Sequence, residues 1–139
     1  MASFNKFNSF IEAVLEKKHD FSSDTFKLML TNVAPVATNT QKSDLTEISA
    51  GSGYTAGGEA VTITSSSQSS GTYSWVITSD ITWTNSGTIG PFQYATLYND
   101  TATNDELVGW WDYGSAVTLS SVGDKFIADL SGVTVITAS

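Results

Sequence analysis

Aromatic and acidic side chains are concentrated in residues 90–114, and they are the residues of this chain best suited to chemistry. The segment holds six aromatic residues, among them the adjacent pair Trp110 and Trp111. Exposed rings of this kind can stack on sugars. Three carboxylates that lie nearby in the sequence are the candidates for the acid–base pair of a glycosidase: Asp105, Glu106 and Asp112. Their spacing singles out no pair, so the sequence favours a binding or structural role.

The other catalytic and ligand-binding patterns are incomplete. His19 is the only histidine and there is no cysteine, so neither a Ser-His-Asp triad nor a transition-metal site has enough partners. We expect His19 to cap a helix end or to be solvated. The glycine-rich run 51–58 is followed by neither a lysine nor a helix, as a phosphate-binding loop would require. A loop crossing between sheets is the better interpretation.

Oxygen ligands are dense in residues 99–105 (NDTATND), but their spacing is not that of an EF-hand calcium loop. Asn and Asp side chains bond their own backbone in turns, so a turn without metal is the preferred interpretation. We therefore predict a protein that is not an enzyme, with no catalytic residue, no bound metal and no cofactor.

Composition excludes two classes of partner. The 139 residues include 14 acidic and 6 basic side chains, a net charge of -8, and all the basic ones are lysine. Phosphate binding needs clustered basic residues, so we expect neither nucleic acid nor an anionic membrane surface as a partner. The N-terminus lacks the continuous apolar run of a signal peptide. We expect the chain to be made in a cytosol.

The pattern after residue 24 predicts short antiparallel strands. Phe26, Leu28 and Leu30 alternate with polar or flexible side chains, as in a half-buried strand. Two apolar runs flanking residues 99–105 predict a β-hairpin, whereas residues 65–71 (SSSQSSG) are expected to form a flexible polar turn. About eight or nine strands at regular spacing indicate an antiparallel sandwich or barrel.

The only helical period covers residues 3 to about 18. Phe4 and Phe7 fit the same apolar stripe as Ile11, Val14 and Leu15, which favours an early start. A capping box at Ser9 would start the helix later. This helix either packs on its own domain or docks on a neighbouring subunit. We predict a mainly β single domain, residues 1–139, with one N-terminal α-helix or arm (residues 1–20) and a β-domain (residues 24–139).

Several stretches resemble a group of small tailed-bacteriophage proteins over nearly the whole chain. They are MASFNKFNSFIEAVLEKKHDFSSDTFKLMLTN, APVATNT, EISAGSGYTAGG, GPFQYATLYNDTATND and GWWDYG. The resemblance implies a structural component of the virion, and within that group we favour a capsid decoration (cement) protein on the outside of the head. The alternative is a minor tail protein or a receptor- or carbohydrate-binding β-sandwich module.

A decoration protein would have major capsid protein subunits as partners, on the capsid surface of the virion. Shell symmetry favours a homotrimer at local three-fold positions, with a dimer as the alternative. Trp and Tyr are enriched at interfaces, and adjacent strand residues point to opposite faces. We therefore expect contacts in the arm, the glycine-rich loop, the hairpin tip and the tryptophan pair: Phe4, Phe7, Tyr54, Asn99, Asp100, Asn104, Asp105, Trp110 and Trp111.

Overall fold

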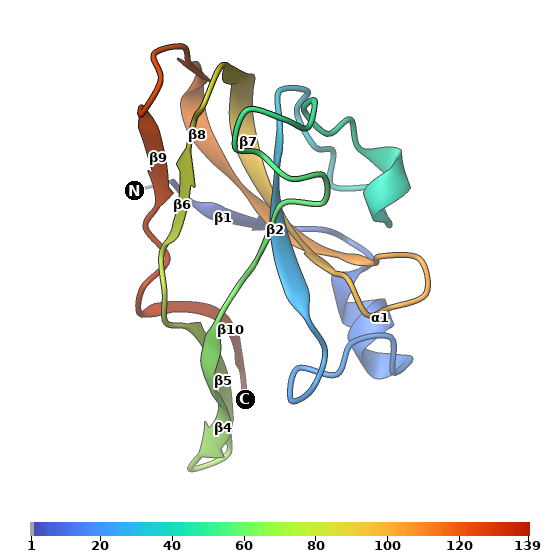
Figure 1. The fold of residues 1–139 in the computed structure, drawn as a ribbon. Coiled ribbons are helices and arrows are strands. Elements are labelled where there is room, and N and C mark those ends of the chain that lie inside the picture. The colour runs from blue at the N-terminus through green and yellow to red at the C-terminus, as the bar shows by residue number, and fades with distance from the viewer. Residues whose placement is uncertain (1) are drawn as a thin grey trace.

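The predicted aromatic hairpin lies at the centre of the largest sheet (Figure 1). The computed structural model describes residues 2–139. Across the sheet, the strands are β1 (Phe4–Lys6), β8 (Leu107–Leu119), β7 (Ile89–Asn99), β2 (Phe26–Thr31) and β3 (Glu59–Ala60). All neighbours are antiparallel, and Tyr98 lies opposite Leu107 next to the hairpin loop. The hairpin and the strand within residues 24–31 are confirmed.

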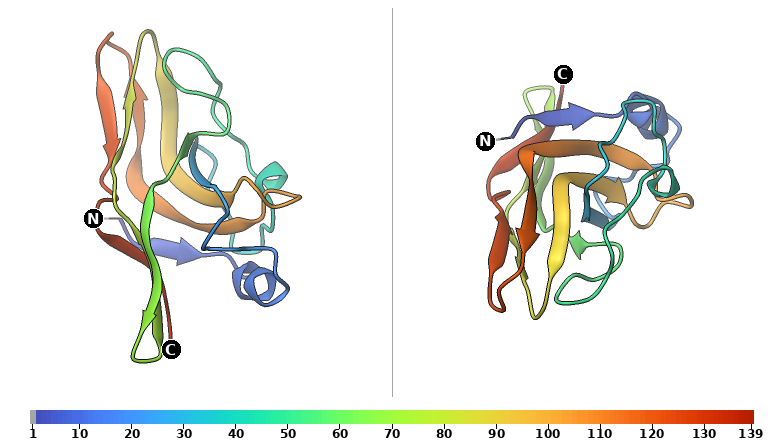
Figure 2. Two further views of the ribbon diagram at one scale, coloured as in Figure 1. Left: turned by 60° about the horizontal axis from the view of Figure 1, so that its bottom comes forward. Right: turned by 90° about the horizontal axis from the view of Figure 1, so that it is seen from above.

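A second layer faces this sheet (Figures 1 and 2). It contains β4 (Ile63–Ser69), β5 (Thr72–Ile77), β6 (Ile81–Thr84), β9 (Lys125–Ala128) and β10 (Val133–Ala138). β10, β5 and β4 form one small sheet, and β6 and β9 form another. At the break between them, Oδ1 of Asp80 accepts the backbone N–H groups of Leu130 (3.0 Å) and Ser131 (2.9 Å). These two hydrogen bonds take the place of the strand-to-strand hydrogen bonds that are missing at the break.

The hydrophobic core fills the space between the layers because each layer turns one apolar face inward. Its fully buried members from the five-stranded sheet include Leu28, Leu30, Phe92 and Leu97, and those from the second layer include Trp75, Ile77 and Trp83. The chain is thus mainly β, antiparallel and sandwich-like, as predicted. Within residues 2–139, no helix is long and apolar enough to cross a membrane.

The N-terminal segment differs from the predicted long helix. Residues 4–6 form β1, and α1 covers only Phe10–Leu15, with a 3₁₀ turn η1 (Lys42–Asp44) later in the chain. The reason is that Phe4 and Phe7 pack on opposite faces of β8. The ring of Phe4 lies 4.8 Å from Trp111, and that of Phe7 lies 4.6 Å from Trp110. A helix would have placed both phenylalanines on one side.

The polar run 65–71 is also not the expected turn. Residues 63–69 form β4, and only Ser70 and Gly71, both with positive φ, make the turn to β5. β4 is an edge strand whose serine side chains are mostly exposed, so burial does not require apolar alternation there. The β4–β5 hairpin projects beyond the rest of the molecule (Figure 2).

Candidate functional site

His19 lies in the interior rather than at a solvated helix end. Its side chain is 6% exposed, and the rings of Phe10, Phe21 and Phe26 surround it at centroid distances of 5.6, 5.6 and 5.9 Å. Burial lowers the pKa of the imidazole, and the nearby carboxylate of Glu106 opposes this shift. The residue is therefore held as a neutral, packed side chain.

Asn99 joins His19 to the loop of the central hairpin. Its Nδ2 atom lies 2.7 Å from Oδ2 of Asp24 and 3.1 Å from Nδ1 of His19. Its Oδ1 atom accepts the backbone N–H groups of Thr101 (2.9 Å) and Ala102 (3.1 Å). The side chain is completely buried, so Asn99, which the sequence placed in an interface, is an internal support of the hairpin loop.

The glycine-rich loop closes onto β2 and buries Tyr54. The Tyr54 hydroxyl accepts the Leu30 N–H (3.0 Å) and donates to Oε1 of Glu47 (2.7 Å). Gly58 has φ +76°, and a Cβ there would lie 1.9 Å from the carbonyl oxygen of Leu28. Only glycine allows this approach. The loop supports the sheet, and Tyr54 is not available to a partner in this structure.

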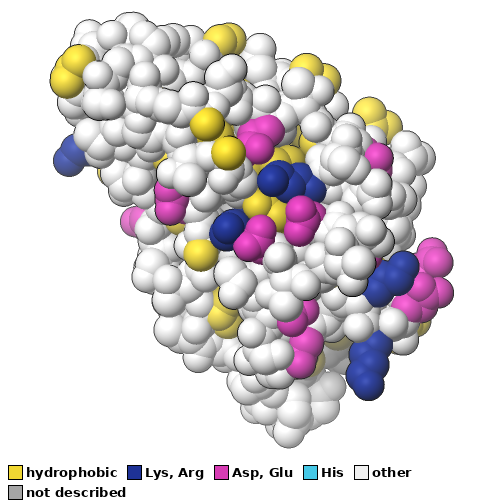
Figure 3. Space-filling model, turned by 45° about the vertical axis from the view of Figure 1, so that its right-hand side comes forward, with side chains coloured by type: hydrophobic (Ala, Val, Ile, Leu, Met, Phe, Trp, Pro, Cys, Tyr) yellow, Lys and Arg dark blue, Asp and Glu magenta, His cyan; other side chains and the backbone are white. Residues whose placement is uncertain are grey.

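The tip of the hairpin stays at the surface. Asp100 forms a salt bridge with Lys27 (Oδ2–Nζ 2.9 Å), Asn104 is exposed, and burial raises the pKa of the half-buried Asp105. Figure 3 shows this side of the molecule, where basic side chains lie beside acidic ones. A role of Asp100, Asn104 and Asp105 in an interface stays a prediction.

The tryptophan pair is partly covered by the chain's own N-terminal segment. Trp110 and Trp111 are half-buried and point to opposite faces of β8, against Phe7 and Phe4 respectively. Phe7 itself is completely buried, which removes it from the candidate interface. An interface role of Phe4, Trp110 and Trp111 stays a prediction.

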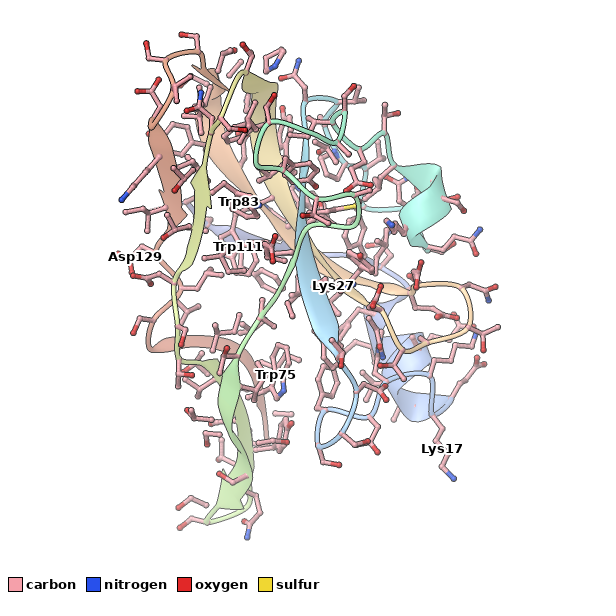
Figure 4. The ribbon with its side chains drawn as sticks, in the orientation of Figure 1. Lys17, Lys27, Trp75, Trp83, Trp111 and Asp129 are labelled. Atoms are coloured by element: carbon pink, nitrogen blue, oxygen red, sulfur yellow. The ribbon has the colours of Figure 1, made fainter. Side chains whose placement is uncertain are left out.

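The structure brings together a cavity that sequence reasoning missed. It has a volume of about 360 Å³ and lies between β7 and β8 of one layer and the β9–β10 segment of the other. Its apolar lining includes Leu28, Leu30, Phe92, Trp111, Tyr113, Phe126 and Leu130. Figure 4 shows Trp111 in the space between the two layers. The cavity depends on the pairing of distant strands, for which the sequence carries no local signal.

A second feature is apolar surface near the N-terminus. α1 is apolar on both sides, because Phe10 and Ala13 face the core while Ile11 and Leu15 are 48% and 81% exposed. The loop after β2 approaches this segment through the hydrogen bond from Asn8 N to Ala37 O (2.9 Å). That loop exposes two valines, Val33 and Val36. We call the two exposed side chains of α1, Ile11 and Leu15, the N-terminal apolar surface.

Across residues 2–139, no three His, Cys, Asp or Glu side chains are grouped so that they could hold a metal ion. Comparisons of the chain with protein families, with curated proteins and with solved structures find no match.

Proposed function

We propose that the protein is a structural, non-enzymatic component of a tailed-phage virion that binds the outside of the head shell as a decoration protein. The observation that carries the proposal is the N-terminal apolar surface. Leu15 is 81% exposed on a helix whose opposite face is already buried. Burying apolar surface against a partner stabilises the complex by about 25 cal/mol per Å² of surface removed from water. Exposed apolar patches therefore mark sites of protein contact.

The resemblance to small phage proteins supplies the partner, and the surface chemistry is consistent with it. A net charge of -8 favours solubility of the free protein, while a few apolar side chains provide contacts once a partner is present. If these contacts form only with the expanded lattice, binding stabilises the mature shell by mass action. The shell lattice would repeat the same contact at every symmetric position.

A head-binding assay with purified chain tests the proposal. We expect the wild-type protein to sediment with expanded heads of the parent phage and not with unexpanded precursors. The double variant Ile11→Ser, Leu15→Ser should lower head affinity at least about tenfold, the equivalent of about 1.4 kcal/mol. Both side chains are exposed, so the change should leave the unfolding free energy within about 0.5 kcal/mol.

Val122→Ser is the matched control. Val122 is 77% exposed in the loop between β8 and β9, so this variant also removes an exposed apolar side chain but leaves the N-terminal apolar surface intact. It should bind heads like the wild type. Equal binding of wild type to expanded and unexpanded shells would contradict a maturation-linked cement, and unchanged binding of the double variant would contradict the assigned surface.

A further inference from the structure

Hydrogen bonds fix the backbone of one segment that lines the cavity between the layers. β9 ends at Ala128 and β10 begins at Val133, and the segment between them lines the cavity. The carboxylate of Asp80 holds the backbone N–H groups of Leu130 and Ser131 at this break. Because the Asp80 carboxylate accepts these two N–H groups, they need no hydrogen bonds to a neighbouring strand where the second layer is interrupted beside the cavity.

Two alanines leave room inside. Ala95 of β7 and Ala128 of β9 line the cavity from opposite layers. The residues two positions away on the same strands have much larger side chains in the core: Leu97 on β7 and Phe126 on β9. An engineered cavity of about 150 Å³ binds benzene, so the volume of about 360 Å³ accommodates one ring with a short chain.

The lining combines aromatic rings with a carboxylate. Trp111, Tyr113 and Phe126 contribute rings, and the rings of Tyr113 and Phe126 lie 5.6 Å apart. Asp129 also lines the cavity and is exposed, next to β9 (Figure 4). Of the described lining residues, none is a lysine. Aromatic faces attract cations, and the carboxylate adds to that attraction and repels anions.

We infer that the cavity binds a small organic cation of the arylalkylammonium type. Its apolar part lies against Leu28 and Leu30, and its ammonium group lies against the aromatic lining on the side where the exposed Asp129 borders the cavity. A neutral compound of the same shape would keep the apolar contacts and lose the attraction to the rings and the carboxylate. The inference is independent of the proposed head binding, which uses the N-terminal apolar surface.

A titration with 2-phenylethylammonium and its neutral analogue 2-phenylethanol tests the inference. Calorimetry should show one saturable site for the cation at about neutral pH, with the alcohol binding at least about tenfold more weakly. In a heteronuclear NMR spectrum, the indole N–H signal of Trp111, assigned with Trp111→Phe, should shift as the site fills. The indole of Trp75, which is buried and does not line the cavity, provides an internal reference signal.

Three variants and one control separate a ligand site from an adventitious void. Ala128→Leu and Ala95→Leu fill the cavity and should abolish binding of both compounds, and thermal unfolding shows whether each is folded. Asp129→Asn should weaken binding of the cation about two- to fivefold, as expected for an exposed carboxylate, and leave binding of the alcohol unchanged. Glu12→Gln, an exposed site on α1, makes the same change in net charge away from the cavity and should have no effect.

The contrary results are equally definite. No saturable binding of the cation up to about 10 mM would overturn the inference. Equal affinity for the cation and the alcohol, or equal losses in Asp129→Asn and Glu12→Gln, would overturn the assignment of a cation site. Binding that persists in either folded leucine variant would place the ligand elsewhere.

Discussion

Asn99 is the residue on which the hairpin loop depends. It lies at the end of β7, and its side chain makes four hydrogen bonds of 3.1 Å or less, to Asp24, His19, Thr101 and Ala102. A buried polar group that loses its partner costs about 1–3 kcal/mol. The side-chain amide of Asn99 is therefore a main determinant of the loop conformation.

We expect Asn99→Ala to lower the unfolding free energy by about 1–3 kcal/mol, because it removes the acceptor of two partly buried backbone N–H groups and one of the two donors to Oδ2 of Asp24. Urea denaturation monitored by tryptophan fluorescence measures the change. Asn32→Ala, at an exposed position after β2, is the control and should lie within about 0.5 kcal/mol of wild type. A similar small effect at Asn99 would contradict the role given to this amide.

His19 makes stability depend on pH. Because burial lowers its pKa in the folded protein below the ordinary value of 6.5, the unfolded chain binds the proton more tightly. The stability from this residue is fully present above about pH 6.5 and is lost as the pH falls toward the folded pKa. Asp24 and Glu106 reduce the shift, and Lys18 adds to it.

Urea midpoints at about pH 7.5 and about pH 5 test this dependence. Wild type should be less stable at the lower pH, with a slope of at most about 1.4 kcal/mol per pH unit. His19→Gln keeps an acceptor for Asn99 and removes the only histidine. This variant should therefore lose clearly less stability than the wild type between the two pH values. An identical loss in both proteins would show that another group is responsible.

At the scale of elements, the glycine-rich loop is part of the sheet's support. Gly58 and Gly71 both have positive φ, but a Cβ at Gly58 would collide with the backbone of Leu28, whereas one at Gly71 meets nothing within 4 Å. We expect Gly71→Ala to cost about 1–2 kcal/mol of backbone strain, and Gly58→Ala to cost distinctly more or to prevent folding. Thermal unfolding measures both, and equal losses would contradict the close packing of the loop on β2.

The sequence predicted those elements whose pattern is local. β2 alternates, and the central hairpin has apolar runs on either side of a turn sequence, so both were found from spacing alone. The N-terminal helix was also predicted, and α1 begins directly after Ser9, the later of the two starts that the sequence offered. β1 was not predicted, because Phe4 and Phe7 satisfy the helical period and their strand-like arrangement is decided by Trp110 and Trp111, more than 100 positions away. β4 was missed because an exposed edge strand needs no apolar alternation.

At the scale of the whole molecule, the sequence predicted surface chemistry better than burial. Of the residues predicted to form an interface, Asp100 and Asn104 are exposed, whereas Phe7, Tyr54 and Asn99 are interior because distant segments cover them. The cavity was not foreseen, since its walls come from strands far apart in the sequence. Ile11 and Leu15 were assigned to an apolar stripe without a way to tell which side of the helix would be covered.

We propose that this chain binds the outside of a phage head, and electron cryo-microscopy of particles that carry the protein would show its position. The fold can be recognised in a map by its projecting β4–β5 hairpin (Figure 2). We expect density for the chain on the outer surface of expanded heads, with Ile11 and Leu15 turned toward the shell. Density only on the tail, or heads that carry none of the protein, would contradict the claim.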